Sequence, residues 1–246
     1  MRILLVNPNT TQAVTESCAR EARAVAAPGT EIVPLTGEFG ARIISSRAEN
    51  AIAAHGLLTM LAKHHTGADA VLLAVSYDTA LMAAREMLSI PVVGMTEAAL
   101  LTAHLVGTRF GLVTFGTPSV YRELVAERGL SARFAGLRSI DTAASAVYAN
   151  PQSVEQRVIE AATALAKEDG AECVVLSGAA MAGFATRIKA SVPVPVLDGI
   201  ACGVPLCEML VRLQLRAPSL GSMVPPSERE TSGLDPALAA LLGRRP

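Results

Sequence analysis

Four polar side chains follow a strongly apolar run in the first third of the chain. The stretch 71–81 reads VLLAVSYDTAL, and its apolar part leads directly into Ser76, Tyr77, Asp78 and Thr79. Serine hydroxyls can donate hydrogen bonds to a carboxylate or amide oxygen, and a phenol can act as an acid or base in a suitable environment. Ligands of open parallel sheets bind beyond the carboxyl ends of the strands, so this turn is a candidate site.

Three further turns of small or polar residues follow apolar runs: NPNTT at 7–11, FGTPS at 115–119 and SGAAMAG at 177–183. Their side-chain amides, hydroxyls and backbone N–H groups suit a small ligand that is anionic or amide-like. Helix capping, and tight packing of glycine and alanine against a sheet, are the alternatives. We predict that Ser76, Tyr77 and Ser177 are catalytic. The predicted substrate-binding residues are Asn7, Asn9, Ser45, Ser76, Tyr77, Thr117, Gly178 and Ala179.

Strand-like apolar runs alternate with helix-like patterns along the chain. The predicted strands are 2–6, 31–35, 70–75, 91–94, 110–115, 136–140, 172–176 and 194–198. The predicted helices are 10–26, 47–66, 79–88, 96–106, 118–129, 152–169, 181–190 and 200–213. Regular strand–helix alternation is typical of an α/β fold whose parallel strands are joined by right-handed crossovers.

The chain also repeats itself. RILLVNPNTT near the N-terminus is similar to RFGLVTFGTPS, and the stretch 68–95 is similar to 171–199. We therefore predict two pseudosymmetric α/β half-domains, 1–105 and 106–215, with parallel sheets flanked by helices and an active-site cleft between them. Residues 216–246 are rich in proline, serine and glycine and form a predicted tail with one short helix at 235–242.

Composition limits the classes of partner. Of the 246 residues 51% are apolar and 17% are charged, and the net charge is −1, so neither nucleic acid nor an anionic membrane is an expected partner. No apolar run reaches the length of a membrane span. The N-terminal stretch resembles a strand and a turn rather than a signal peptide, so we expect a cytoplasmic protein. The high apolar content favours a homo-oligomer, since exposed apolar faces are usually covered.

Motifs for metals and nucleotides are absent from the sequence. The four cysteines are widely spaced, and the four histidines lie in predicted helices without a ligand pair such as HExxH, so no metal site is predicted. No G-x-G-x-x-G follows the first strand and no P-loop is present, so no dinucleotide is expected.

Several ordered segments carry a family resemblance. They are ILLVNPNTT, DAVLLAVSYDTALMAARE, IPVVGMTEAAL, RFGLVTF, VVLSGAAMAG and VPVLDG. Together, over about 1–215, they resemble the aspartate/glutamate/hydantoin racemase superfamily, in its hydantoin and allantoin racemase branch. The resemblance implies an enzyme without a cofactor that binds a small carboxylate or cyclic imide between two pseudosymmetric domains. It also implies two cysteines flanking the substrate α-carbon, one removing its proton and the other delivering a proton to the opposite face.

Other residues stand where the resemblance places these two cysteines. The first position lies three residues before Asp78, where the chain has Val75, and the second lies two residues after Leu176, where it has Gly178. Of the remaining cysteines only Cys202 follows a strand end at a helix N-terminus, where the pKa of a thiol can fall. The other three are interpreted as structural.

Ser76 and Ser177 are each adjacent to one of these positions and form a matched pair across the repeat. A serine needs an activating partner to act as a base, so both fit better as donors to a carboxylate or imide oxygen. Tyr77 is the candidate acid or base, and Asp78 is expected to cap the helix at 79–88. The expected function is an isomerase of the racemase family. A non-thiol hydrolase, lyase or decarboxylase, and an inactive ligand-binding relative, are the alternatives.

Overall fold

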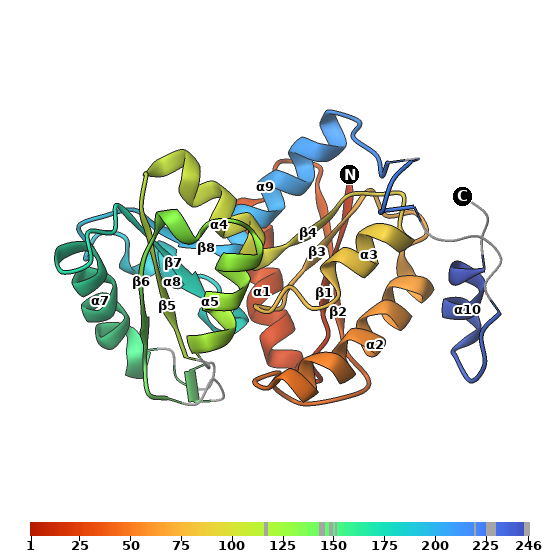
Figure 1. Ribbon diagram of the computed structural model, residues 1–246, viewed down its shortest axis with the longest axis horizontal. Helices are drawn as coiled ribbons and strands as arrows, with labels where there is room; N and C mark the ends of the chain where they lie inside the picture. The colour runs from red at the N-terminus through yellow and green to blue at the C-terminus, as the bar shows by residue number, and fades with distance from the viewer. Residues whose placement is uncertain are drawn as a thin grey trace.

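The strand–helix alternation expected from the sequence is present in the computed structural model (Figure 1). The structure describes residues 1–115, 118–142, 146–147, 150, 152–218, 220–224 and 230–243.

Two parallel sheets of four strands form the centre of the molecule. The first has the order β2-β1-β3-β4 and the second has the order β6-β5-β7-β8, so each half places its strands in the same sequence. The strands of the first sheet are β1 (Arg2–Asn7), β2 (Glu31–Thr36), β3 (Ala70–Leu73) and β4 (Val92–Gly94). Those of the second are β5 (Phe110–Thr114), β6 (Phe134–Ser139), β7 (Cys173–Ser177) and β8 (Val196–Asp198). The predicted α/β fold class, with two parallel sheets flanked by helices, is confirmed.

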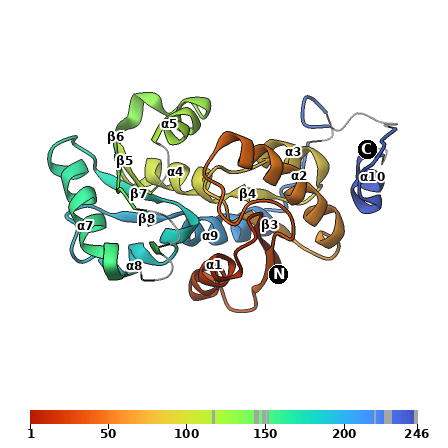
Figure 2. The same cartoon turned by 90° about the horizontal axis from the view of Figure 1, so that it is seen from below.

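Helices cover both faces of the sheets. They are α1 (Gln12–Val25), α2 (Arg47–His64), α3 (Leu81–Met87), α4 (Met95–Val106), α5 (Pro118–Glu127), α7 (Gln152–Lys167), α8 (Phe184–Ile188), α9 (Gly199–Arg212) and α10 (Pro236–Leu242). Two 3₁₀ turns are η1 (Ser131–Arg133) and η2 (Ala179–Met181). Figure 2 shows α1 and α9 on one face of the first sheet and α2 and α3 on the other. Within the described residues, no helix combines the length and apolarity needed to cross a membrane.

Side-chain caps fix where several helices begin. Ser46 and Glu49 form a reciprocal capping box at the start of α2, because each side chain accepts from the other residue's backbone N–H. Asp198 accepts hydrogen bonds from the N–H groups of Ile200 and Ala201 at the start of α9.

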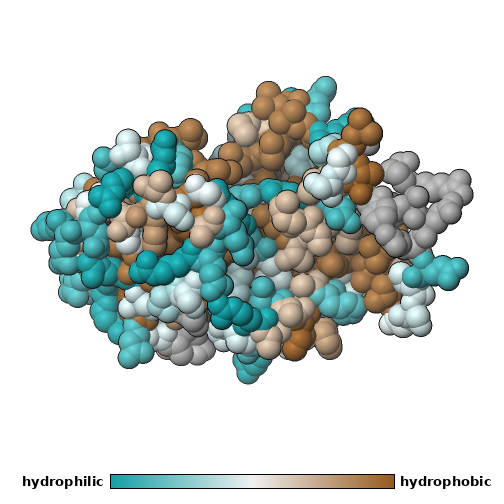
Figure 3. All heavy atoms as spheres, in the orientation of Figure 1, coloured by the Kyte–Doolittle hydropathy of each residue, from teal (hydrophilic) through white to brown (hydrophobic). Residues whose placement is uncertain are grey.

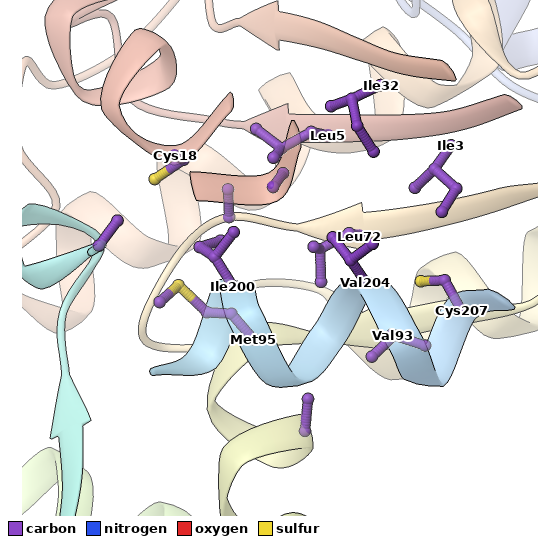
Figure 4. Close-up of a cluster of buried hydrophobic side chains, with 14 of the residues drawn as sticks. Ile3, Leu5, Cys18, Ile32, Leu72, Val93, Met95, Ile200, Val204 and Cys207 are labelled. Carbon is purple, nitrogen blue, oxygen red and sulfur yellow. The ribbon is translucent and has the colours of Figure 1, made fainter. Parts of the chain in front are cut away.

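The last helix of each half packs against the sheet of the other half. Ile200 and Val204 of α9 share a buried cluster with Leu72 of β3, and Figure 4 shows these side chains pointing toward one another. A Cβ atom on Gly203 would lie 2.4 Å from Leu72 Cδ1, so α9 approaches this sheet as closely as glycine allows. In the same way, Leu100 of α4 is buried with residues of β5 and β7. This exchange of helices fixes the two halves relative to each other.

The short helix predicted at 235–242 is present as α10. Leu238 and Leu241 are buried in the same apolar cluster as Leu57 and Leu61 of α2. Lys63 Nζ lies 2.9 Å from a carboxylate oxygen of Asp235, the N-cap residue of α10. The helix therefore completes the outer layer of the first half, away from the strand ends that carry the candidate site.

Candidate active site

A cavity of about 340 Å³ lies where strand ends of the two sheets meet. It is lined by residues from both halves of the chain, as a site in the cleft between them requires. The lining residues are Asn9, Val14, Ile43, Ile44, Ser45, Val75, Ser76, Tyr77, Thr114, Phe115, Tyr121, Ser177, Gly178, Ala179 and Ala180.

Most of the residues singled out in the sequence are brought together here. Those that line the cavity are Asn9, Ser45, Ser76, Tyr77, Ser177, Gly178 and Ala179. Ser76 and Ser177, which come from different halves, line the same cavity, as the repeat predicted. Asn7 is fully buried and does not line the cavity, and Thr117 lies outside the described residues.

The turn after β1 uses one asparagine to orient another. Asn7 Nδ2 donates to Asn9 Oδ1 and to Thr15 Oγ1, both at 2.9 Å, and the Thr11 N–H also donates to Asn9 Oδ1 at 2.9 Å. Asn9 Oδ1 is therefore occupied, while its Nδ2 has no acceptor among the described residues and lies beside the cavity. Asn7 thus orients the Asn9 side chain, whose amide group can donate.

The turn after β7 presents unpaired donors to the cavity. Ser177 is 2% exposed, and its Oγ has no hydrogen-bond partner among the described residues. The N–H groups of Gly178 and Ala179 also have no described acceptor, although the Gly178 carbonyl accepts from the Met181 N–H at 2.8 Å. Buried polar groups are normally paired, so this cluster of donors points to a ligand that accepts.

Gly178 has an unusual backbone conformation. Its φ is +143°, a region that residues with a side chain rarely adopt, and a Cβ atom built there would meet no atom within 4 Å. The position thus offers open space but a backbone that suits only glycine.

The turn after β3 is also strained, at Asp78 (φ +48°) and Ala80 (φ +54°). Asp78 does not cap the helix at 79–88 as expected, because the N-cap of α3 is Ala80, which makes no side-chain cap. Instead Asp78 accepts hydrogen bonds from the N–H groups of Thr96 and Glu97, at 3.0 and 2.8 Å, and so caps α4. The left-handed backbone turns the carboxylate toward that helix rather than its own.

Asp78 also ties the two halves together. Its Oδ2 lies 3.0 Å from Arg128 Nη2, which belongs to the second half. Complete burial raises the pKa of Asp78 to about 7, against the opposing effects of the Arg128 guanidinium and the two N–H groups. Asp78 does not line the cavity, but Thr96 Oγ1 donates to the Ser76 carbonyl at 2.7 Å and holds the turn in place.

Two tyrosines lie together at the cavity wall. The Tyr77 hydroxyl donates to the Ser45 carbonyl at 3.1 Å, and its ring meets that of Tyr121 edge-on with centroids 5.9 Å apart. Tyr121 lines the cavity from the second half and is 3% exposed, and burial raises the pKa of its hydroxyl. Sequence reasoning missed Tyr121, although it is one of three tyrosines and lies two residues after the FGTPS turn.

The rest of the wall is apolar. It is formed by the side chains of Val14, Ile43, Ile44, Val75 and Phe115. No lining residue in the described part of the chain carries a charge. Sequence reasoning also missed Ile43 and Ile44, which come from the loop between β2 and α2. The described residues contain no cluster of three or more histidine, cysteine, aspartate or glutamate side chains able to hold a metal ion.

The cysteines lie outside this wall. Cys202 was expected to gain acidity from the N-terminus of α9, but burial instead raises its pKa to about 11. Burial also raises the pKa of Cys173 to about 11, and that of Cys18 and Cys207 well above the usual range. Their thiols are protonated at neutral pH and poorly reactive.

Known proteins are similar to this chain in sequence and in structure. The Asp/Glu/Hydantoin racemase family model matches residues 3–207. A hydantoin racemase of Paenarthrobacter aurescens is 32% identical over 235 residues, covering 94% of this chain and 99% of that protein. The structure of allantoin racemase from Klebsiella pneumoniae superimposes with a TM-score of 0.92 at 36% identity, covering 97% of this chain and 98% of that one. The structure of allantoin racemase from Pseudomonas fluorescens superimposes with a TM-score of 0.91 at 34% identity, covering 95% of this chain and 100% of that one. This chain therefore belongs to the Asp/Glu/hydantoin racemase family.

Proposed function

We propose that the protein is a cofactor-independent enzyme that acts on a small hydantoin-like cyclic imide in the shared cavity. The observation that carries the proposal is the set of uncharged donors, contributed by both halves, around a cavity without a cationic residue among the described ones. Hydantoin and allantoin rings present neutral amide oxygens, and the names of the relatives point to such rings. A dicarboxylate would need compensating positive charge, so we favour the imide over the carboxylate.

The donors are arranged for a developing oxyanion. Removal of a proton next to a carbonyl group places negative charge on the carbonyl oxygen, and fixed donors stabilise that charge. Ser76 comes from the first half of the chain and Ser177, Gly178 and Ala179 come from the second, and all four line the cavity. Tyr77 is the residue proposed to exchange a proton with the ring.

Val75 and Gly178 support a second candidate function. Neither residue can transfer a proton, so the two-thiol reaction implied by the family resemblance has no acid–base pair here. A relative that binds the ring without turning it over would keep the donors and dispense with the thiols.

Solvent deuterium exchange separates the two candidates. With an enzyme, the proton at C5 of 5-benzylhydantoin should be replaced in D₂O, and NMR would show the loss of its signal above a protein-free control. Binding by calorimetry without exchange would support the ligand-binding relative instead. Absence of binding to hydantoins and allantoin, together with binding to dicarboxylates, would contradict the proposed substrate class.

Ser76→Ala tests the site itself. Loss of one donor to the ring should weaken hydantoin binding by about ten- to a hundredfold, because a hydrogen bond to a partly charged oxygen contributes about 1.5–3 kcal/mol. If Ser76 served only as a turn or cap residue, affinity would be unchanged and the free energy of unfolding would fall by about 1 kcal/mol. Calorimetry and a melting curve of the same variant distinguish the outcomes.

We also propose that the protein assembles with copies of itself. Supporting this, α4 exposes Leu101, Leu105 and Val106, and the adjacent α9 exposes Met209 and Leu213. Figure 3 shows hydrophobic residues gathered along the upper edge of the molecule. Leu105→Glu should lower the mass measured by sedimentation without lowering monomer stability, since Leu105 is 85% exposed. An unchanged mass would place the interface elsewhere or exclude assembly.

Two further proposals concern organisation and location. The repeated strand order supports half-domains of 1–105 and 106–215. Four unpaired cysteines fit a reducing compartment and support a cytoplasmic location.

A further inference from the structure

The turn after β3 combines backbone strain with two residues of the cavity wall. Ser76 and Tyr77 line the cavity, and the next residue, Asp78, has a left-handed backbone with a φ of +48°. Ala80 is also left-handed, with a φ of +54°. Residues other than glycine keep such conformations only where the surrounding structure holds them. The contacts that hold this turn therefore determine where Ser76 and Tyr77 lie.

Several of these contacts come from the first half itself. The N–H groups of Thr96 and Glu97 donate to the Asp78 carboxylate at 3.0 and 2.8 Å. Thr96 Oγ1 also donates to the Ser76 carbonyl at 2.7 Å. Gly94 leaves room for the carboxylate, because a Cβ atom there would lie 2.5 Å from Asp78 Cγ. These groups hold the turn against its own half of the molecule.

Arg128 holds the same carboxylate from the second half. Its Nη2 donates to Asp78 Oδ2 at 3.0 Å, and its Nε lies 3.8 Å from Glu97 Oε1. The Asp78 side chain is fully buried and that of Arg128 is 17% exposed, so water has little access to the pair. Charge pairs removed from water add little net stability, and what they supply in several proteins is a fixed geometry. The pair therefore fixes the position of the turn relative to the second half.

The helix before Arg128 contacts this turn a second time. The Tyr121 ring of α5 meets the Tyr77 ring edge-on with centroids 5.9 Å apart, and both residues line the cavity. Arg128 Nη1 donates to the Leu124 carbonyl in the last turn of α5 at 3.5 Å. Arg128 itself does not line the cavity, so it can act on a ligand only through the turn that it holds.

We propose that Arg128 is a positioning residue, whose ion pair with Asp78 fixes the strained turn across the two halves and so sets where Ser76 and Tyr77 meet the bound ring. The proposal rests on the proposed function, because it concerns donors of the same cavity. Arg128 acts through Asp78 and has no part in the turn after β7 that carries Ser177.

Calorimetry with 5-benzylhydantoin tests this role. The measurements are made at about pH 8, where the Asp78 carboxylate, whose pKa burial raises to about 7, is charged. Arg128→Met keeps an unbranched side chain and removes the charge, and we expect it to raise the dissociation constant about tenfold. Arg128→Lys restores a cation and should return the dissociation constant to within about threefold of the native value. A residue needed only for folding would change Tm and leave the affinity of the folded protein unchanged.

Arg138→Met is the matched control. Arg138 Nη2 lies 2.9 Å from a carboxylate oxygen of Glu168 and 2.7 Å from one of Asp169, all within the second half. Arg138 does not line the cavity and does not contact the turn after β3. Its loss should change the dissociation constant by less than about twofold.

A double-mutant cycle tests whether Arg128 acts through Asp78. In an Asp78→Asn background, Arg128→Met should change the dissociation constant by less than about twofold, because the charge that it pairs with is already gone. In a Ser177→Ala background its effect of about tenfold should persist, since the two residues act on different turns.

The outcomes separate this proposal from the proposed function. If the native protein does not bind the probe, the proposed function is wrong and the positioning role falls with it. If the native protein binds but Arg128→Met binds equally well, or weakens binding by the same factor as Arg138→Met or in the Asp78→Asn background, only the positioning role is wrong. Should Arg128→Met fail to fold, Asp78→Asn breaks the same pair from the first half, and normal affinity in that variant would overturn the proposal. Circular dichroism of every variant establishes that it is folded.

Discussion

Replacing Ser177 by alanine should make the unliganded protein more stable. The Ser177 hydroxyl is 2% exposed at the end of β7 and has no hydrogen-bond partner among the described residues. A buried polar group without a partner costs about 1–3 kcal/mol, and alanine removes it while losing one oxygen atom of packing. We therefore expect the free energy of unfolding to rise by about 1 kcal/mol. In a chain of this size that corresponds to an increase of about 2–4 °C in Tm.

The same substitution should weaken ligand binding. If Ser177 donates to a developing oxyanion or an imide oxygen, its loss should raise the dissociation constant of 5-benzylhydantoin about ten- to a hundredfold. Urea denaturation followed by circular dichroism measures the stability, and calorimetry measures the affinity. Thr96→Val is the matched control for stability, because Thr96 is 3% exposed and its hydroxyl donates to the Ser76 carbonyl at 2.7 Å. Removing a paired hydroxyl should lower stability rather than raise it.

Two results would refute this reasoning. A loss of stability in Ser177→Ala would mean that the hydroxyl is satisfied in the unliganded protein. A gain in stability with unchanged affinity would mean that the hydroxyl is buried beside the cavity without facing the ligand.

Three further outcomes are expected. Iodoacetamide at pH 7.5 should leave hydantoin binding intact, because burial raises the pKa of Cys202 to about 11 and the other thiols are no more acidic. Loss of binding after selective labelling of Cys202 in the folded protein would contradict this. Gly94→Ala should lower the free energy of unfolding in urea by about 1–3 kcal/mol, because its Cβ would lie 2.5 Å from Asp78 Cγ; Gly56→Ala, whose Cβ meets nothing closer than 3.5 Å, should not. Burial raises the pKa of Asp78 from 3.8 to about 7, so its contribution to stability is complete below about pH 4 and is lost as the pH rises through about 7. The stability of the native protein relative to Asp78→Asn should therefore fall over that range, and a constant difference would show that Asp78 does not titrate there.

The strands and the turns that follow them could be predicted from the sequence with small errors. Residues 110–115 were predicted as a strand, and β5 spans Phe110–Thr114. Strands buried on both faces are short apolar runs bounded by polar or glycine-rich turns, so their ends are marked in the sequence. Because parallel strands end at the same edge, the position of a site beyond those ends follows from local information alone.

The rest depends on contacts between distant segments. Tyr121 lies on α5, and nothing in its local sequence shows that it reaches the cavity and packs edge-on against Tyr77 of the other half. Ile43 comes from a loop whose path over the cavity is set by tertiary contacts. The prediction that Asp78 caps the helix after it was wrong for a similar reason. A capping residue normally serves the helix that follows it, but the left-handed turn here directs the Asp78 carboxylate to the N-terminus of α4.

The two positions at which the family resemblance places cysteines differ in their physical constraints. Val75 is 5% exposed, and its backbone carries a side chain without difficulty, so a cysteine would fit there with less volume than valine. At Gly178 the space is open, but a φ of +143° disfavours any side chain, so the backbone rather than crowding excludes a thiol. The same conformation leaves the N–H groups of Gly178 and Ala179 without acceptors beside Ser177. The turn that disfavours a side chain is thus also the turn that leaves donors beside the cavity, which supports the proposed stabilisation of a negative carbonyl oxygen there.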